Sequence, residues 1–361
     1  MYKIALILLV FLTAHAFRSQ DKTPDAGKPI TLGAYYFNGW KADSKHVTEA
    51  LRDSFPEREP KWGWVTSTQA VMDAQINEAA DAGLSFFSFC WYFKKNKPLT
   101  ESNTILNLYH NSPNRNRLKH CLLIANHEGN EIGPADWHKV SAEWIKQFKT
   151  SSYLTVDGKP LLIIFEVNSL IKQFGTTAKV KEALNYLRDS ARKEGLNGVT
   201  IAACVGSYPD VALKAKACGF DITTAYNLHK AGYKNRVSRQ IPIDSLINSE
   251  RMIWDRISAV SKLPYIPVAT LNWDPRPWAD SSNNYNTKPY YVGFSSGSVF
   301  RSIQSLVRWM RLHQTQTTKE QVALLYAWNE YGEGAWLTPS KNSSDKPLEG
   351  LKKALSQKQN N

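Results

Sequence analysis

Two glutamates near the end of the chain, Glu330 and Glu333, are the residues whose type and spacing most directly suggest chemistry. They lie in the segment LLYAWNEYGEGAW (residues 324–336), where an apolar run stops at Asn329 and glycines follow at 332 and 334. In an extended chain, residues three apart are separated by roughly 10 Å and face opposite ways. A turn, which the intervening glycine allows, would bring the side chains to about 5–6 Å.

Two carboxyl groups held close in a partly dry cleft acquire different pKa values, so that one is an acid and the other a base at neutral pH. Glycoside cleavage needs such a pair, one group to protonate the leaving oxygen and one to supply electrons or act as a base. The alternative is that both glutamates are solvated residues of a glycine-containing loop. The apolar run before them and the aromatic residues around them favour the catalytic interpretation.

Short apolar runs alternate with longer amphipathic runs along the chain, which predicts strands alternating with helices. The expected strands are Ile30–Phe37, Leu84–Trp91, Cys121–Asn126, Pro160–Glu166, Val199–Val205, Asp221–Tyr226, Tyr265–Leu271 and Val322–Trp328. The expected helices are Ser67–Ala82, Glu101–His110, Ala135–Lys149, Val180–Glu194, Pro209–Ala217, Ile243–Ser261, Ser298–His313 and Leu348–Gln357. Ser67 with Thr68 is the expected N-cap of the first helix, and Gly83 its stop.

Near-continuous apolar strands are typical of parallel sheets that are buried on both faces. Eight strand–helix units fit an α/β fold that is a single (β/α)8 TIM barrel with long strand-end loops, and we expect one catalytic domain over residues 30–357. The loops are Lys41–Thr66 and Asp274–Gly297. The alternative is an open doubly wound sheet, which usually has fewer units or a glycine-rich phosphate loop, and neither G-x-G-x-x-G nor G-x-x-x-x-G-K-[ST] occurs.

In such barrels the chemistry lies at the carboxyl ends of the strands, and here those ends combine aromatic, amide and acidic residues. Aromatic rings stack on pyranose faces, while amides and acids bind hydroxyls, so these ends suit a sugar. The expected substrate-binding residues are Tyr35, Trp40, Trp91, Tyr92, Asn126, His127, Glu166, Tyr226, Asn272, Trp273, Arg276, Trp328, Asn329 and Tyr331. Trp40, Trp91, Trp273 and Tyr226 are either stacking platforms or core plugs.

Three further residues at the strand ends leave more than one interpretation open. Glu166 ends the fourth strand, where many barrel glycosidases have their acid/base, so it is a second candidate for catalysis as well as for substrate contact. His127 and Glu128 are adjacent but lack metal-ligand spacing, so we expect hydroxyl recognition. Arg276, with Asp274, could bind a polar or anionic substituent of the substrate. We expect no metal and no organic cofactor.

Several blocks of this sequence resemble a known family. The block AWNEYGEGAWLTP resembles the N-E-x-x-E-G signature of glycoside hydrolase family 99 and of its broader relatives, the WbsX-like proteins often associated with polysaccharide biosynthesis. The blocks GAYYFNGW, DAGLSFFSFCWYF, KPLLIIFEV and LNWDPRP are similar to further blocks of the same group, in the same order, so the resemblance covers most of the chain. Between the glutamates, members of family 99 usually carry an aromatic residue and a histidine. This chain has Tyr331-Gly332 there, which is closer to the WbsX-like branch.

The resemblance implies a (β/α)8 barrel that acts on α-linked mannosides with retention, as an endo-acting enzyme. It implies that Glu330 acts as a base on the substrate's own 2-hydroxyl and Glu333 as general acid/base on the glycosidic oxygen. Two other classes of function stay open. One is a glycosyltransferase or polysaccharide-assembly protein. A secretory signal at the N-terminus argues against this class, because nucleotide sugars are cytoplasmic. The other is a carbohydrate-binding barrel without catalysis.

The N-terminus has the layout of a cleaved secretory signal over residues 1–16. Lys3 precedes the apolar stretch Ile4–Leu12, and small residues stand at Ala14 and Ala16. A polar lead-in at 17–29 would follow, and we expect a secreted or periplasmic protein without membrane insertion. The 45 Lys and Arg exceed the 32 Asp and Glu, for a formal charge of +13. Basic residues are dispersed, which favours a generally basic surface.

We expect a monomer that acts on a polysaccharide or glycan and does not bind nucleic acid; the charge leaves an anionic polymer open as substrate. The four cysteines, Cys90, Cys121, Cys204 and Cys218, stand mostly in apolar, strand-like runs. One disulfide is an option, but buried free thiols fit this placement better.

Overall fold

The computed structural model of this chain describes residues 29–233 and 238–357. The signal peptide expected over residues 1–16 lies outside the described residues, as does the lead-in up to residue 28. Within the described ranges, no helix is both long and apolar enough to cross a bilayer. The four cysteines are free and buried, as expected.

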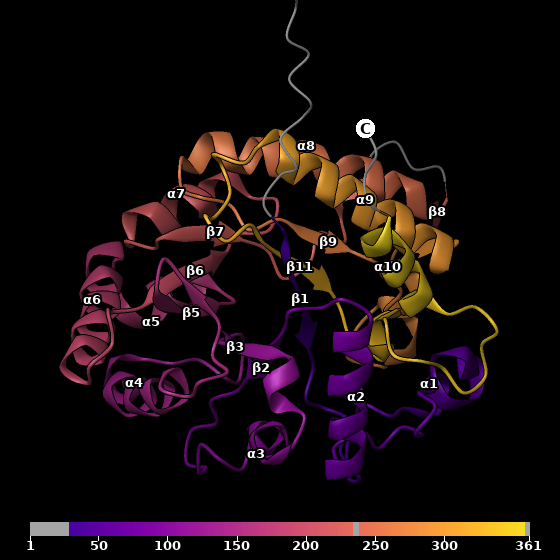
Figure 1. The fold of residues 1–361 in the computed structure, drawn as a ribbon, viewed down its shortest axis with the longest axis horizontal. Coiled ribbons are helices and arrows are strands. Elements are labelled where there is room, and N and C mark those ends of the chain that lie inside the picture. Colours follow the sequence, from indigo (N-terminus) through magenta and orange to yellow (C-terminus); the bar gives the residue numbers. More distant parts are fainter. Residues whose placement is uncertain (1–28, 234–237, 358–361) are drawn as a thin grey trace, which may run out of the picture.

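Eight parallel strands form the centre of the described chain, one at each position expected from the apolar runs (Figure 1). They are β1 (Thr31–Tyr36), β2 (Phe86–Trp91), β3 (Lys119–Ile124), β5 (Lys159–Ile164), β6 (Thr200–Cys204), β7 (Ile222–Thr224), β9 (Val268–Thr270) and β11 (Val322–Tyr326). Their order in the sheet is β7-β6-β5-β3-β2-β1-β11-β9. The predicted (β/α)8 fold is confirmed.

The two ends of this sheet meet at the segment that precedes β9. Thr223 of β7 pairs with Tyr265 in a parallel bridge. The amide of Thr223 donates to the carbonyl of Pro264, and the amide of Ile266 donates to the carbonyl of Thr223, each at 3.0 Å. These bonds join β7 to the chain entering β9, so the barrel is nearly closed and leaves little free sheet edge.

The helices surround the strands, as Figure 1 shows. They are α1 (Glu49–Ser54), α2 (Gln69–Asp81), α3 (Thr104–Asn111), α4 (Pro134–Phe148), α5 (Val167–Phe174), α6 (Thr177–Lys193), α7 (Pro209–Ala217), α8 (Ile243–Ser261), α9 (Ser296–Leu312) and α10 (Pro347–Ser356). The expected N-cap is confirmed, since the Thr68 hydroxyl accepts from the amide of Val71. Gly83 follows α2 at φ +93°, a conformation that favours glycine.

Barrel strands are buried on both faces, between the filled interior and the helix layer, which is why they were recognisable as continuous apolar runs. All six residues of β2 are buried, as are all five of β11. Because the eight strands are parallel, their carboxyl ends all open on the same side of the barrel. The loops that follow them therefore share one rim.

Two helices were not expected, and each is short. Helix α1 lies in the segment 41–66 that we expected to be a loop. Helix α5 begins directly after β5, where Val167, Leu170 and Phe174 form a buried face with helical spacing. A helix of eight residues this close to a strand has too few turns for its period to stand out, so the sequence pattern there indicates only the strand.

Candidate active site

The two glutamates lie on a tight hairpin that follows the last barrel strand. Strand β12 (Asn329–Glu330) pairs antiparallel with β13 (Ala335–Trp336), and residues Tyr331–Glu333 between them form one turn of 3-10 helix. Gly334 ends that turn at φ +75°, in the left-handed region. The chain therefore bends between Glu330 and Glu333, as the glycines led us to expect.

Gly332 is needed in this turn because an aromatic side chain packs directly on it. A Cβ atom added at Gly332 would lie 2.0 Å from Cε2 of Trp278, in the loop after β9. No side chain fits there unless the hairpin or the Trp278 loop moves. The close approach thus couples the turn carrying Glu333 to a loop that is more than fifty residues distant in sequence.

We expect Gly332→Ala to destabilise the protein by about 1–3 kcal/mol, because overpacking forces the backbone or Trp278 to shift. Equilibrium urea unfolding measures this change. Gly297→Ala is the matched control: it lies in the first turn of α9, where the new Cβ meets the Arg301 guanidinium at an ordinary 3.6 Å. Equal stability for the Gly332→Ala variant and the native protein would show that the contact does not constrain the turn.

Each glutamate accepts a hydrogen bond from a tyrosine hydroxyl. Tyr226, just beyond β7, donates to Oε1 of Glu330, and Tyr326, the last residue of β11, donates to Oε2 of Glu333. The two tyrosine rings touch edge to face, with centroids 5.0 Å apart at 73°. Two phenols in contact with each other thus hold the two carboxyl groups, and place both at the same part of the rim.

Burial sets the protonation of the pair. Glu330 is 3% exposed, and its Oε2 has no hydrogen-bond partner among the described residues. Burial raises the pKa of Glu330 to about 7, against the opposing effect of the Tyr226 hydrogen bond. Burial also raises the pKa of Glu333 to about 8. At neutral pH Glu333 therefore keeps its proton while Glu330 is about half ionised, which divides the pair into an acid and a base.

Other expected residues also reach this part of the rim. Burial raises the pKa of the partly buried Tyr92, and the nearby carboxyl groups of Glu330 and Glu333 raise it further. The Asn272 amide donates to the Gly334 carbonyl at 2.7 Å, while its Oδ1 is buried without a partner in the described chain. The structure thus gathers Tyr92, Tyr226 and Asn272 around the glutamates.

His127 and Glu166 lie farther along the rim. The His127 ring is partly exposed and meets the edge of Tyr92 at 6.2 Å between centroids. Glu166 is also partly exposed, at the N-cap of α5. In the part of the chain that the structure describes, neither side chain forms a hydrogen bond or ion pair with the two glutamates.

Asparagine side chains join neighbouring strand ends. Asn126 exchanges two hydrogen bonds of 2.8 Å with the backbone of Glu166, and Asn329 does the same with Phe37. Asn103 of the loop before α3 makes the equivalent pair with Tyr92. The side-chain oxygen and nitrogen of Asn126 and of Asn329 are therefore both bonded to the backbone. These two residues, which we expected to contact the substrate, instead hold neighbouring strand ends together.

Several aromatic residues that we expected to stack on sugars are packed inside the protein. Trp91 and Trp328 are almost fully buried, and the indole N–H of Trp328 donates to Gln75 at 2.6 Å. Tyr35 is buried too, and its hydroxyl donates to the Ala225 carbonyl. A buried ring presents no face to a ligand, so Trp91 is a core plug, the alternative left open for it, and the expected substrate contacts Trp328 and Tyr35 are packed in the interior as well.

Trp40 and Tyr331 belong to a small second core beneath the hairpin. They pack with Phe37, Leu51 and Trp336, and the Trp40 indole donates to the Asn329 carbonyl at 2.8 Å. The Tyr331 ring lies 4.8 Å from that of Trp40. These rings support the turn from below and do not line it. Trp273 is 7% exposed and stacks on His229.

An arginine that the sequence did not single out anchors the turn. Arg58, from the 41–66 loop, donates to the carbonyls of Asp274 and Tyr331 at 3.1 Å and to the Asp274 carboxylate at 2.5 Å. The Asp274 amide in turn donates to the Glu333 carbonyl at 2.7 Å. No local pattern marked Arg58, because its partners are more than two hundred residues away.

Arg276 completes this ion-pair group. It donates to the Asp274 carboxylate at 2.7 and 2.8 Å. Burial opposes ionisation of Asp274, but the hydrogen bonds from Arg276 and the charge of Arg58 hold its pKa below the ordinary value. The carboxylate therefore stays charged, and Arg276, which we expected to contact the substrate, is ion-paired within the protein.

Comparison with known proteins shows one family and several solved structures to which this chain is similar. Residues 62–351 match the model of a family described as glycosyltransferase WbsX. A solved glycoside hydrolase-like protein aligns with a TM-score of 0.64 at 16% identity, over 91% of this chain and 94% of that one. The GH99 endo-α-mannosidase of Bacteroides thetaiotaomicron aligns with a TM-score of 0.59 at 14% identity, over 91% and 96%. The complex of that enzyme with bis-tris-propane aligns with a TM-score of 0.58 at 13% identity, over the same shares of the two chains.

At these sequence identities the structural likeness establishes the fold. No curated protein sequence matches the chain.

Proposed function

This chain belongs to the WbsX family, and from that membership and its active-site geometry we propose that it is a retaining glycoside hydrolase. Its substrates are α-mannosidic or similarly configured linkages in a polysaccharide or glycan. The observation that carries the proposal is the pair of carboxyl groups, the buried Glu330 and the partly buried Glu333, on one hairpin at the mouth of the barrel. The signal-like N-terminus supports export to the periplasm or the exterior as part of the same proposal.

The first half of the reaction follows the roles that the family resemblance assigns. Glu330 takes the proton of the substrate's 2-hydroxyl, and the freed oxygen attacks the anomeric carbon. At the same time Glu333 gives its proton to the departing glycosidic oxygen, so the bond to the leaving sugar breaks. This step leaves a 1,2-anhydro sugar, a protonated Glu330 and an ionised Glu333.

The second half reverses these proton transfers with water. Glu333 takes a proton from a water molecule, whose oxygen attacks the anomeric carbon and opens the three-membered ring. Glu330 then returns its proton to the 2-oxygen. Two inversions at the anomeric carbon give net retention, and both carboxyl groups end in their starting states. The tyrosines Tyr226 and Tyr326 orient the two carboxyl groups throughout.

We expect kcat/KM to be greatest between about pH 7 and pH 8. Glu330 must be ionised, so activity falls as pH drops through its pKa of about 7. Glu333 must be protonated, so activity also falls as pH rises through its pKa of about 8. A pH profile of kcat/KM measures both limbs. An optimum near the ordinary glutamate pKa of about 4.3 would contradict this division of roles.

The function itself is tested by screening the protein against α-mannans and sulfated or uronic polysaccharides, with the products identified by mass and their anomeric form by NMR. Release of oligosaccharides whose new reducing end keeps the α configuration supports the proposal. The family description suggests a second candidate, a glycosyltransferase, which would instead bind a sugar nucleotide and lengthen a glycan. Glycan binding that survives loss of both glutamates, without products, would indicate a binding barrel.

A further inference from the structure

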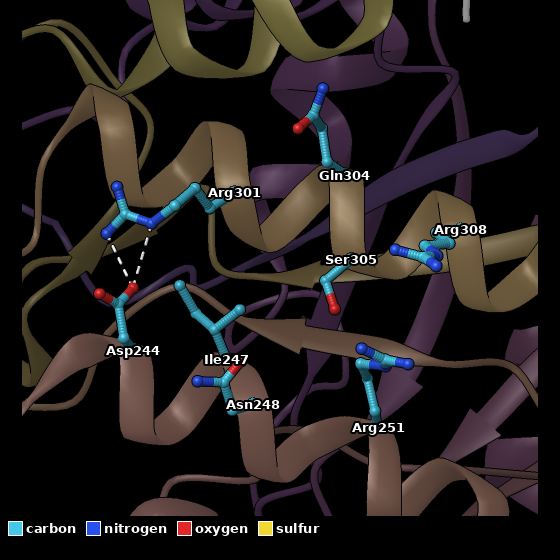
Figure 2. Close-up of a pocket in the computed structure, with 8 residues that line it drawn as sticks. All are labelled: Asp244, Ile247, Asn248, Arg251, Arg301, Gln304, Ser305 and Arg308. Atoms are coloured by element: carbon cyan, nitrogen blue, oxygen red, sulfur yellow. Dashed lines mark hydrogen bonds and ion pairs between the residues drawn. The ribbon is translucent and has the colours of Figure 1, made fainter. Parts of the chain in front are cut away.

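A polar groove lies on the outer wall of the barrel, between helices α8 and α9, and no residue of the hairpin that carries the two glutamates lines it. Its volume is about 430 Å³, and Figure 2 shows the side chains that line it. They are Asp244, Ile247, Asn248, Arg251, Arg301, Gln304, Ser305 and Arg308. Three of the eight are arginines and one is an acid, so the groove carries a net positive charge.

The single acid of the groove, Asp244, is already ion-paired with one of the three arginines. Nε and Nη2 of Arg301 donate to Oδ1 of Asp244 at 3.1 and 2.8 Å (Figure 2). Arg251, from α8, and Arg308, from α9, have no hydrogen-bond or ion-pair partner among residues 29–233 and 238–357. The groove therefore presents two uncompensated guanidinium groups, one from each wall.

The two acids that neighbour Arg251 on α8, Asp255 and Glu250, form no ion pair with it. Asp255, one turn further along α8, accepts from the indole N–H of Trp309 at 2.6 Å and lies 3.3 Å from Nε2 of His313. Glu250, the residue before Arg251, is 1% exposed and turned inward, where its Oε1 accepts from the Thr270 amide at 2.7 Å. Both of these acids are thus directed to other partners, and the Arg251 guanidinium stays without a direct ion pair in the described part of the chain.

Two guanidinium groups on opposite walls can donate to one oxyanion between them, and charge-assisted bonds from planar arginine forks suit sulfate, phosphate and carboxylate. Asn248, Gln304 and Ser305 add neutral hydrogen-bonding groups to the same lining. These suit the hydroxyls that accompany an acidic group on a sugar. Ile247, the one apolar residue of the lining, is only 7% exposed, so the groove offers a lipid chain no exposed apolar side chain. No aromatic ring lines it for base stacking.

We propose that the α8–α9 groove is an accessory binding site for a sulfate, phosphate or carboxylate group carried on an acidic polysaccharide. The oxyanion chemistry comes from Arg251 and Arg308; the choice of a polysaccharide as carrier rests on the proposed function. Bound there, the polymer is held on the wall of the barrel, which raises its concentration near the catalytic rim.

The test measures binding of a sulfated dextran oligosaccharide to the full chain by isothermal titration at low ionic strength. The uncharged dextran of equal length, inorganic sulfate and a single-stranded DNA of similar charge are the comparison ligands. The protein variants are Arg251→Gln/Arg308→Gln and a charge-matched control, Arg52→Gln/Lys139→Gln, whose two residues lie on α1 and α4. We expect the dissociation constant to rise about tenfold in the groove variant and less than about twofold in the control.

Added salt should weaken binding to the native protein more than to the groove variant. Equal loss in the two double variants would overturn the proposal, since it would trace binding to net charge alone. If the uncharged dextran bound with equal affinity, the groove would not recognise an oxyanion, and that part of the proposal would be wrong. If the DNA or inorganic sulfate bound more tightly than the sulfated dextran, the proposal that a polysaccharide carries the acidic group would be wrong. Binding needs no turnover, so a failure here is distinguishable from a failure of hydrolysis.

Discussion

Replacing Glu333 by glutamine should reduce kcat/KM on a natural glycan by about 10²–10⁴-fold. Glutamine has the same shape and can still accept the hydrogen bond from Tyr326, but it cannot give a proton to the departing oxygen. An aryl α-mannoside with an acidic phenol departs without that proton. The loss on the aryl substrate should therefore be much smaller than the loss on the oligosaccharide, and comparison of the two kcat/KM values measures the acid role.

The matched control for this variant is Glu131→Gln, the same change in a partly exposed carboxyl group of the loop after β3. We expect it to keep nearly full activity. Both variants should unfold at the same temperature as the native protein, because neither removes a packed group. A fully active Glu333→Gln protein would show that Glu333 is not the catalytic acid. If the Glu166→Gln variant were then inactive, Glu166 would be assigned as the acid.

Replacing Glu330 by glutamine should produce a loss of similar size, about 10²–10⁴-fold, but on both kinds of substrate. The reason is that Glu330 activates the attacking oxygen, and a good leaving group does not replace an absent base. Glutamine keeps an acceptor for the Tyr226 hydroxyl, so the site should retain its shape. The measurement is again kcat/KM on the oligosaccharide and on the aryl mannoside, for the same preparations.

The two variants together distinguish the roles of the glutamates. If Glu330→Gln retained activity on the aryl mannoside while Glu333→Gln lost it, the acid and the base would be exchanged. The pH profile gives an independent control, because Glu330→Gln should remove the limb near pH 7 from any residual activity and leave the limb near pH 8. A residual activity that kept both limbs would mean that another group provides the lower one.

Strand positions were predictable because a barrel strand is buried on both faces. Burial of this kind demands unbroken apolar runs such as those of β2 and β11, and such runs are local in the sequence. The glutamate hairpin was predictable for a similar reason. Glycines at 332 and 334 mark a turn, and the apolar run before it marks the strand that carries the turn to the rim.

Aromatic residues at the strand ends were not predictable in the same way. Trp328 and Tyr226 look alike in sequence, each standing two residues past the end of a strand. Only packing separates them: Trp328 is enclosed and bonded to Gln75, whereas Tyr226 reaches Glu330. Asn329 and Asn272 differ likewise, since one has both amide atoms bonded and the other keeps a free oxygen.

The sequence alone thus determined the barrel, the order of its units and the hairpin on which Glu330 and Glu333 stand, because these depend on period, burial and glycine at neighbouring positions. The tertiary structure decided what surrounds the two carboxyl groups. Tyr226 meets Glu330 across 104 residues of sequence, and Arg58 meets the Tyr331 carbonyl across 273. Contacts between such distant residues leave no periodic trace, and the elevated pKa values of the glutamates arise from that burial.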